Sequence, residues 1–558
     1  MRSLRFLCVT LLVPCLLARD PVRARSAMVV AQEPLATDVG VAVMKAGGNA
    51  VDAAVAIGFA LAVTHPFAGN LGGGGFMLIR MADGTSTFID FREKAPLAAT
   101  RDMYVGPDGK LTHDSLVGWR ASGVPGSVRG FELAHKKFGK KSWSAVVQPA
   151  VTLADKGIRV SYALSESLKA GTKIMEPFPD SKRIFLRNGK NYEVGDLFRQ
   201  PELAATLKRI KKYGANDFYQ GEIARKFAAA EKANGGPITL EDLKGYQAAE
   251  RKPLSGRYHD YDIITSPPPS SGGVGILQML GMLEGSGYEK TGAGSAASIH
   301  YVAETMRRFY ADRSEYMGDP DFVKVPIAKL LDPRYIASRR DSIDPNHATP
   351  SDQVRPGVLP PNEPTETTHY NVVDSQGNAV AVTYTLNGGY GSGVTVPGLG
   401  FLLNNEMDDF AAKPGEPNLF GLIQGEANAI QPGKRPLSSM TPTIVLHGGK
   451  LFMLAGAPGG SRIINGVLEV ILNVIDFHMN AQDAVDWPRF HHQWMPDKLY
   501  LERGISPDTA ALLKGMGYNV ESSEKTSVVI ARTEAIVNDN GWLQGGSDGR
   551  GSGKAAGY

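Results

Sequence analysis

The chain has 558 residues, of which 42% are hydrophobic and 21% are charged, a composition typical of a soluble globular protein. Its formal net charge of +3 is small, so composition indicates neither a nucleic-acid partner nor a polybasic membrane surface. Beyond residue 18 no run of 18 apolar residues follows, which argues against a membrane span in the mature protein.

The first residues have the pattern of a secretory signal peptide. Arg2 and Arg5 supply its positive charge, and residues 6–18 form an apolar core too short to span a bilayer. Ala24 ends a small-residue cleavage site, so we expect a signal peptide over residues 1–24, with the cut itself left open, and a periplasmic or secreted protein. Both cysteines lie in this segment, which leaves the mature chain without a disulfide or a cysteine-bound metal.

The next segment predicts helices and then a hairpin. Residues 34–63 form two helical patterns rich in small residues, separated by a Gly-Gly pair. Residues 76–81 and 85–90 predict two strands around an Ala-Asp-Gly turn. The glycine run at residues 72–75 precedes a strand and lacks the Lys-Ser/Thr ending of a phosphate loop, so we do not assign it to nucleotide binding.

Residues 97–350 predict mainly helices joined by polar loops, with a capping box at residues 239–242. Ser270 and Ser271 lie in a turn that leads into a helix. The Gly-x-Ser-x-Gly elbow of serine hydrolases is missing around them, so we expect turn and cap roles for both. Residues 351–364 contain four prolines and predict an extended connector.

The clearest hairpin of the chain follows this connector. Residues 370–373 and 379–385 are β-branched and aromatic runs on either side of a turn rich in Asp, Gly and Asn. A second hairpin, at residues 443–447 and 450–456, precedes an apolar helix. Hairpins on both sides of a helical middle suggest one large layered domain of mixed α and β structure.

Thr367 stands at the mouth of the first of these strands. Threonine is common in strands, so its ordinary interpretation is a structural residue at the edge of a strand. The alternative is chemical: a threonine that becomes a chain terminus has an α-amine that titrates near pH values of about 7.7 to 8.0. Such an amine can act as the base for the hydroxyl of its own residue.

The run Thr-Thr-His-Tyr-Asn-Val-Val-Asp from Thr367, continued by Val-Thr-Tyr-Thr-Leu-Asn up to Asn387, resembles the processing site of the γ-glutamyltransferase (glutathione hydrolase) family. This family is a branch of the N-terminal nucleophile hydrolases. The resemblance spans nearly the whole mature chain, and its joint order is highly specific although each motif is short. The other motifs lie at residues 47–54, 72–76, 90–96, 267–273, 403–410, 435–440, 458–462 and 488–494.

The resemblance implies an α+β fold, the four-layer αββα sandwich of the N-terminal nucleophile hydrolases. It implies autocatalytic cleavage between Glu366 and Thr367 into a large subunit, residues 25–366, and a small subunit, residues 367–558, which stay together as one unit. It also implies a γ-glutamyl hydrolase and transferase without a cofactor. The substrates implied are glutathione and other γ-glutamyl amides, with water, an amino acid or a peptide as acceptor.

Residue roles are implied position by position. Thr367 is the implied nucleophile, Thr385 orients it, and the backbone N–H groups of Gly459 and Gly460 face the oxyanion. A γ-glutamyl group carries an α-carboxylate beside an α-ammonium. The family implies Arg92, Ser438 and Ser439 for the carboxylate, and Asn387, Glu406 and Asp409 for the ammonium. Taken singly, each of these residues has an ordinary structural explanation.

Two other functions stay open. A related enzyme that removes other acyl groups, such as a glutaryl-type cephalosporin acylase, acts on a substrate without the α-amine, so the ammonium set favours the γ-glutamyl substrate. An unprocessed secreted binding protein would keep the chain intact.

Two further positions carry expectations. His491 and His492 are adjacent in an extended segment and point to opposite faces, so we expect structural roles and no metal. Phe420 stands where many bacterial members of the family carry a tyrosine in a lid over the pocket.

Overall fold

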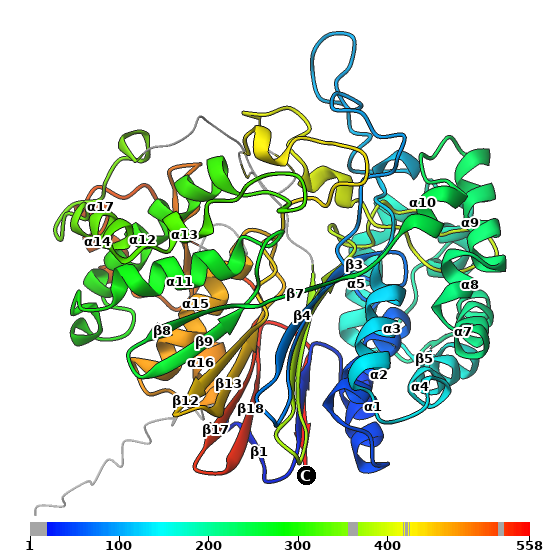
Figure 1. The fold of residues 1–558 in the computed structure, drawn as a ribbon, viewed down its shortest axis with the longest axis horizontal. Coiled ribbons are helices and arrows are strands. Elements are labelled where there is room, and N and C mark those ends of the chain that lie inside the picture. Colours follow the sequence, from blue (N-terminus) through cyan, green and yellow to red (C-terminus); the bar gives the residue numbers. More distant parts are fainter. Residues whose placement is uncertain (1–18, 355–366, 417, 419–421, 423, 523–528) are drawn as a thin grey trace, which may run out of the picture.

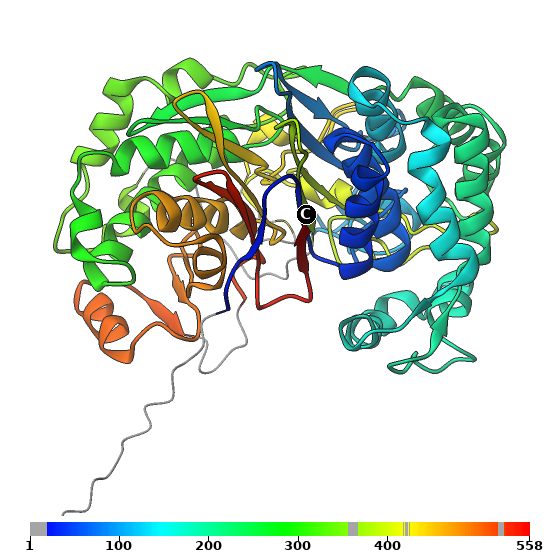
Figure 2. The same cartoon turned by 90° about the horizontal axis from the view of Figure 1, so that it is seen from below.

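The computed structural model describes residues 19–354, 367–416, 418, 422, 424–522 and 529–558. Two seven-stranded sheets face each other, and a layer of helices covers the outer side of each sheet (Figure 1). Seen from below, the sheets run through the middle of the molecule with helices on both sides (Figure 2). The expected α+β fold with αββα layers is confirmed.

We call one sheet the β10 sheet. Its strands pair antiparallel in the order β19-β2-β10-β11-β3-β4-β7. In chain order they are β2 (Met28–Ala31), β3 (Gly74–Arg80), β4 (Ser86–Asp90), β7 (Ala249–Arg251), β10 (Thr368–Val373), β11 (Ala379–Thr385) and β19 (Lys554–Gly557).

The facing β13 sheet is also antiparallel, in the order β1-β18-β17-β13-β12-β9-β8. Its strands are β1 (Val22–Ala24), β8 (Leu254–Tyr258), β9 (Tyr261–Thr265), β12 (Thr443–His447), β13 (Lys450–Gly456), β17 (Glu534–Asp539) and β18 (Trp542–Ser547). Two minor sheets contain β5 (Ile158–Arg159), β6 (Leu197–Phe198), β14 (Phe490–His491), β15 (Leu499–Leu501) and β16 (Val520–Ser522).

The helices divide between the two outer layers (Figure 1). On the side of the β10 sheet lie α1 (Pro34–Lys45), α2 (Ala50–Thr64), α3 (Ser127–Phe138), α4 (Trp143–Lys156), α5 (Tyr162–Met175), α6 (Pro179–Phe185), α7 (Pro201–Tyr213), α8 (Ala215–Tyr219), α9 (Glu222–Ala233) and α10 (Leu240–Gly245). On the side of the β13 sheet lie α11 (Gly272–Leu283), α12 (Ala296–Tyr316), α13 (Ile327–Leu330), α14 (Pro333–Asp341), α15 (Arg462–Ile475), α16 (Ala481–Asp486) and α17 (Pro507–Gly515).

The predicted helix pair near the start of the chain is confirmed as α1 and α2. Asn49 and Asp52 form a capping box at the start of α2. Every residue of α2 is buried, as its continuous apolar run requires, because the helix packs against both the sheet and other helices. A Cβ atom on Gly40 of α1 would lie 2.5 Å from Cδ1 of Ile57, so the small residue permits the close approach of the two helices.

Side chains of β10 alternate between the helices and the facing sheet. The Tyr370 hydroxyl donates to the Ala54 carbonyl of α2 (2.9 Å), so even-numbered positions face the helices. Asn371 donates from Nδ2 to the Glu534 carbonyl of β17 (2.9 Å), so odd-numbered positions face the β13 sheet. Thr367, which precedes the strand, continues the odd-numbered face and points between the sheets.

The prediction that residues 97–350 are mainly helical is confirmed for α3 to α14, and the capping box at α10 forms. It is wrong for residues 249–265, which contain β7, β8 and β9. These strands are short, and several of their side chains are only partly buried, so they lack the long apolar run of a central strand. Strand β7 pairs with β4 and β9 pairs with β12, both distant in sequence, whereas β8 forms a hairpin with β9 at the edge of the sheet.

The segments before and after Thr367 interleave in both sheets. In the β10 sheet, β2 lies between β19 and β10, and β11 lies beside β3. In the β13 sheet, β9 pairs with β12, and β1 pairs with β18. Neither segment therefore forms a sheet of the sandwich by itself.

Most of the expected signal peptide and of the proline-rich connector lies outside the described residues. Residues 1–18, with Cys8 and Cys15, and residues 355–366 are not described. Val22–Ala24, at the expected signal cleavage site, form β1 of the sandwich. Within the described part, no helix is both long and apolar enough to cross a membrane.

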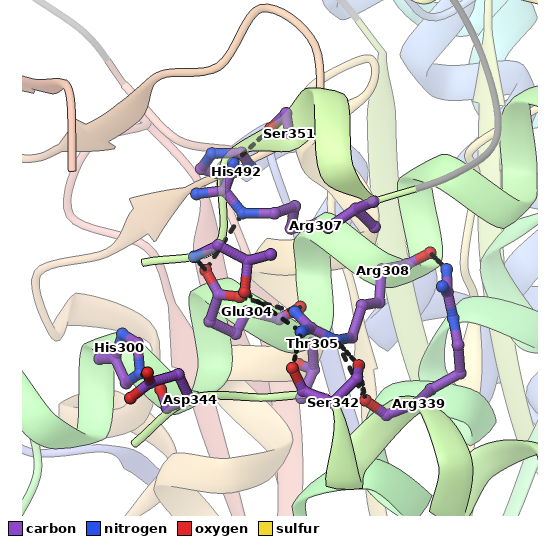
Figure 3. A network of polar contacts seen from close by, with 12 residues as sticks. His300, Glu304, Thr305, Arg307, Arg308, Arg339, Ser342, Asp344, Ser351 and His492 are labelled. Carbon is purple, nitrogen blue, oxygen red and sulfur yellow. Dashed lines mark hydrogen bonds and ion pairs between the residues drawn. The ribbon is translucent and has the colours of Figure 1, made fainter. Parts of the chain in front are cut away.

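A buried ionic network on α12 fixes the residues just before the undescribed connector (Figure 3). Arg307 and Arg308 both bond Glu304, at 3.1 and 2.6 Å, and Arg307 also bonds the Ser351 hydroxyl and Asp497. Main-chain N–H of Ser351 donates to Asp497 Oδ2 (2.8 Å). The network thereby holds Ser351 against α12 and Asp497, on the side of the β13 sheet.

Candidate active site

A small pocket lies between the sheets, near the start of β10 and beyond the end of β13. Nine of the ten residues that the sequence predicts for the site line it, so the fold gathers positions from distant segments. They are Arg92, Thr367, Thr385, Asn387, Glu406, Asp409, Ser438, Ser439 and Gly460. Gly459, the tenth, precedes Gly460 in the loop after β13, whereas Glu366 of the expected cleavage site lies outside the described residues.

Thr367 and Thr385 are neighbours across one antiparallel ladder. Thr368 pairs with Tyr384, so continuing the register by one residue sets Thr367 opposite Thr385. Both threonines are buried, at 5% and 2% exposure, and both line the pocket. The Thr385 hydroxyl oxygen accepts the main-chain N–H of Asn387 (2.8 Å), which fixes its position at the strand end.

The loop after β13 faces this threonine pair. Gly459 and Gly460 have φ values of +144° and +56°, so this loop uses backbone conformations that favour glycine. A Cβ on Gly459 would lie 2.9 Å from the Ala531 Cα. The carbonyls of Gly459 and Gly460 accept the N–H groups of Arg462 and Ile463 (3.0 and 3.2 Å), so the loop runs directly into the first turn of α15.

The predicted glycine run at residues 72–75 has a packing role beside the site. A Cβ on Gly73 would lie 2.0 Å from the Thr385 carbonyl oxygen, and one on Gly72 would lie 2.2 Å from the Leu402 carbonyl oxygen. Glycine is therefore required because two backbones pass close to β3 at its start. This contact supports the ends of β11 and of the loop that leads to Glu406.

Arg92 lies at the centre of a buried charge cluster just after β4. Its guanidinium bonds both Glu406 and Asp409, which lie on a short 3₁₀ helix, Glu406–Asp409. It also donates to the carbonyls of Pro436 (3.3 Å, from Nε) and Leu437 (3.1 Å, from Nη2). Arg92, predicted to bind the substrate carboxylate, is thus ion-paired with Glu406 and Asp409, which are predicted to bind the substrate ammonium.

The cluster contains more carboxylates than Arg92 alone can neutralise. Glu93 lies 3.7 Å from the Arg92 guanidinium and is fully buried. Burial raises the pKa of Glu93 to about 7, although Arg92 acts in the opposite direction. Burial also raises the pKa of Glu406 well above its usual value, and that of Asp409 above its own. Burial therefore favours the protonated forms of these three carboxyl groups, and Arg92 opposes that effect.

Ser438 and Ser439 are held by the turn before α11. The Ser438 N–H donates to the Pro269 carbonyl (2.9 Å), and its carbonyl accepts the N–H and hydroxyl of Ser271 (2.8 and 2.9 Å). Ser270 donates its hydroxyl to the Met440 carbonyl (2.7 Å). Both turn serines thus have the backbone contacts expected of turn residues.

His491 and His492 are buried among protein hydrogen-bond partners. The ring nitrogens of His491 bond Asn465 and Gln493 (2.7 and 2.8 Å), and burial lowers its pKa well below the usual value. His492 accepts the Trp494 N–H at Nδ1 (3.0 Å) and bonds Asp497 through Nε2 (3.2 Å). Burial lowers the pKa of His492 to about 4, so both rings are neutral at pH 7.

A sequence model described as Gamma-glutamyltranspeptidase matches residues 36–558. The chain belongs to the gamma-glutamyltranspeptidase family. A "Glutathione hydrolase proenzyme" of Escherichia coli (strain K12) is 51% identical over 533 residues, covering 95% of this chain and 91% of that protein. The expected family and enzyme class are confirmed.

Solved structures agree with this gamma-glutamyltranspeptidase assignment. The Helicobacter pylori gamma-glutamyltranspeptidase is 47% identical, with a TM-score of 0.57, over 58% of this chain and 93% of that one. A cephalosporin acylase from Bacillus halodurans is 26% identical with a TM-score of 0.86, and the match covers 99% of each chain. The sandwich is thus shared by gamma-glutamyltranspeptidases and an acylase, so substrate choice depends on the pocket.

Sequence reasoning missed one charged residue of this gamma-glutamyltranspeptidase pocket. Arg313 of α12 lines it, together with the apolar side chains of Leu422, Met440 and Ile463. Arg313 lies in the sequence Asp-Arg-Ser-Glu-Tyr, which looks like an exposed helix face. Phe420, noted in place of a lid tyrosine, lies outside the described residues.

Proposed function

We propose that the protein hydrolyses and transfers γ-glutamyl groups, with glutathione and other γ-glutamyl amides as substrates, through an acyl-enzyme on Thr367. The observation that carries this proposal is the gathering of Thr367, Thr385, the glycine loop and the Arg92 charge cluster around one small pocket. Family membership alone does not assign these roles, because an acylase has the same sandwich.

Maturation begins with the bond between Glu366 and Thr367. The Thr367 hydroxyl attacks the Glu366 carbonyl, the acyl group moves from nitrogen to oxygen, and water hydrolyses the resulting ester. The products are a fragment of residues 25–366 that ends in a carboxylate and a fragment of residues 367–558 that begins with an α-amine. Before cleavage this nitrogen is an amide and cannot serve as a base; afterwards it is an amine and can.

In the mature enzyme, Thr367 Oγ attacks the γ-carbonyl of the substrate and its proton passes to the α-amine, directly or through water. The N–H groups of Gly459 and Gly460 stabilise the oxyanion; the position of both glycines just before α15, with Gly460 lining the pocket, supports this role. The leaving amine takes the proton, and an ester of Thr367 remains. Water or an amino-acid or peptide acceptor then attacks this ester and regenerates the hydroxyl.

Substrate binding exchanges partners within the buried charge cluster. The substrate brings one carboxylate and one ammonium, and Arg92, Glu406 and Asp409 already form an ion-paired set. The substrate carboxylate joins Arg92, Ser438 and Ser439, while its ammonium joins Asn387, Glu406 and Asp409. Because each new ion pair replaces an existing one, charges remain compensated during binding.

A glutaryl-type acylase is the competing enzyme. Its substrate would bring a carboxylate without an ammonium into a wall that already contains Glu406 and Asp409. We expect γ-glutamyl-p-nitroanilide to be cleaved faster than glutaryl-p-nitroanilide; the reverse preference would favour the acylase.

Processing is tested with the full chain and Thr367→Ala. N-terminal analysis of the native protein is expected to find a fragment that begins at Thr367, whereas the alanine variant stays intact and inactive. A native protein that remains one mature-length band, with no fragment starting at Thr367, would favour an unprocessed binding protein.

A further inference from the structure

Arg313 differs from the other buried arginines of its own helix. Arg307 and Arg308 each form an ion pair with Glu304 (Figure 3), at 3.1 and 2.6 Å. Arg313, at 2% exposure, has no carboxylate within ion-pair distance among the described residues. Asp409 favours the charged form of Arg313 from beyond ion-pair distance. A buried guanidinium without a direct ion pair is still costly, so an anionic group that enters the pocket would gain a favourable partner there.

The contacts of Arg313 leave one side of its guanidinium for the pocket. Its Nε donates to the Ser271 hydroxyl (2.9 Å), and its Nη2 donates to the Ser439 hydroxyl (3.3 Å). Its Nη1 is buried and has no hydrogen-bond partner in the described part of the chain. Burial lowers the pKa of Arg313 to about 10, which still leaves it charged at pH 7.

Arg92, unlike Arg313, is already paired with carboxylates of the protein. Both of its terminal nitrogens bond carboxylates, Nη1 to Glu406 and Nη2 to Asp409. Arg313 and Ser439 line the same pocket and already bond each other. A carboxylate at Ser439 would therefore meet two hydrogen-bond donors, Nη1 of Arg313 and the serine hydroxyl, one of which carries a positive charge.

We propose that Arg313 is a second guanidinium for the substrate α-carboxylate, which it binds through Nη1 while its Nη2 holds Ser439 in place. This inference rests on the proposed function, because it names a further residue of the same substrate site. Arg313 thereby selects acyl groups that carry a carboxylate at the end remote from the reacting carbonyl. The role is substrate binding, and Arg313 takes no part in proton transfer.

The test compares substrates that differ by that one group. γ-Glutamyl-p-nitroanilide has the α-carboxylate, and 4-aminobutyryl-p-nitroanilide is the same acyl group without it. We expect Arg313→Met to lower kcat/KM for the first by roughly 10- to 100-fold, mainly through KM, the range for one charge-assisted hydrogen bond. For the second we expect a change of less than about threefold, because this substrate has no carboxylate for Arg313 to bind.

Arg308→Met is the matched control, since it removes a buried guanidinium from the same helix outside the pocket. It is expected to lower the melting temperature and leave the ratio of the two kcat/KM values unchanged. Arg313→Lys retains a charge, so we expect its ratio of the two kcat/KM values to lie between those of the native enzyme and the Arg313→Met variant. If the methionine variant does not process, the lysine variant decides the question by the same ratio.

Equal losses with both substrates in an Arg313 variant would make the residue structural and overturn the proposal, as would no loss with either. A native enzyme that cleaves neither γ-glutamyl-p-nitroanilide nor glutathione would instead overturn the proposed function. The two failures are distinguishable because the first is read from variants of an active enzyme.

Discussion

Thr385 lies directly across the β10–β11 ladder from Thr367, and both side chains line one pocket. A single hairpin therefore sets the spacing between the proposed nucleophile and the hydroxyl beside it. Because strand pairing sets this spacing, it does not depend on how the substrate binds. Changes at Thr385 should accordingly affect chemistry more than binding.

Thr385→Val removes the hydroxyl with little change in shape. We expect self-cleavage and kcat each to fall by roughly 10- to 100-fold, because the hydroxyl proposed to orient Thr367 is lost and the Asn387 N–H loses its acceptor. Thr385→Ser retains the hydroxyl and should retain most of both rates. Time courses on denaturing gels and steady-state kinetics measure the two effects. A valine variant as fast as the native enzyme would remove Thr385 from the mechanism.

The glycine loop gives an ordered pair of variants. Gly459→Ala meets both an unfavourable φ of +144° and the Ala531 backbone, whereas Gly460 has a φ of +56° that other residues adopt at moderate cost. We expect kcat to fall by about 100-fold or more for Gly459→Ala and by less for Gly460→Ala, since displaced N–H groups stabilise the oxyanion poorly. Single-turnover kinetics provide the ranking, and the opposite order would contradict this geometry.

Arg92→Met should destabilise the fold as well as weaken binding. The substitution leaves Glu406 and Asp409 buried without their guanidinium, which costs about 3 to 5 kcal/mol for a broken buried pair. Denaturant unfolding in a Thr367→Ala background measures this cost on an uncleaved chain. Adding Glu406→Gln and Asp409→Asn should recover part of the loss; no recovery would show that the cost arises from packing.

Glu93 predicts a pH dependence of stability. Its pKa is about 7 in the folded protein against an ordinary value of 4.5, so between these pH values the folded state binds more protons than the unfolded state. The contribution of Glu93 is therefore present below pH 4.5 and is lost as the pH rises through about 7. Relative to Glu93→Gln, we expect the native free energy of unfolding to fall by on the order of 2 kcal/mol over this range. Parallel pH profiles of the two proteins would refute the assignment.

Strand β1 predicts where the mature chain begins. Val22–Ala24 pair with Leu543 to Gly545 of β18, so a cut after Ala24 would remove an edge strand and expose the main chain of β18. We expect the signal peptidase to cut before Val22. N-terminal sequencing of the exported large fragment checks this, and a fragment that begins at Arg25 would show that the sandwich tolerates the loss of β1.

The sequence predicted the parts of the fold that depend on local chemistry. The hairpins β3–β4, β10–β11 and β12–β13 and the capping box of α10 follow from turn residues and side-chain alternation. Strands β8 and β9 were missed because their side chains are largely only partly buried, and because β12, which pairs with β9, lies far along the chain. The site residues came from motif resemblance, since spacing alone does not bring Arg92 to Asp409.

Arg313 could not be found in this way. Helix α12 buries Glu304, Arg307, Arg308, Asp312 and Arg313, so its charged residues look like a solvent-exposed surface when read without partners. Only the ion pairs of the folded protein separate the neutralised arginines from the one that faces the pocket.

The interleaving of the two sheets makes maturation a one-way event. Once the peptide bond before Thr367 is cut, β2 and β10 belong to different molecules, and so do β11 and β3. A denatured mature enzyme would have to reassemble by collision of two incomplete chains, whereas the precursor folds at a rate independent of concentration. Folding must therefore come first, and the persistence of the cut enzyme rests on how slowly it unfolds.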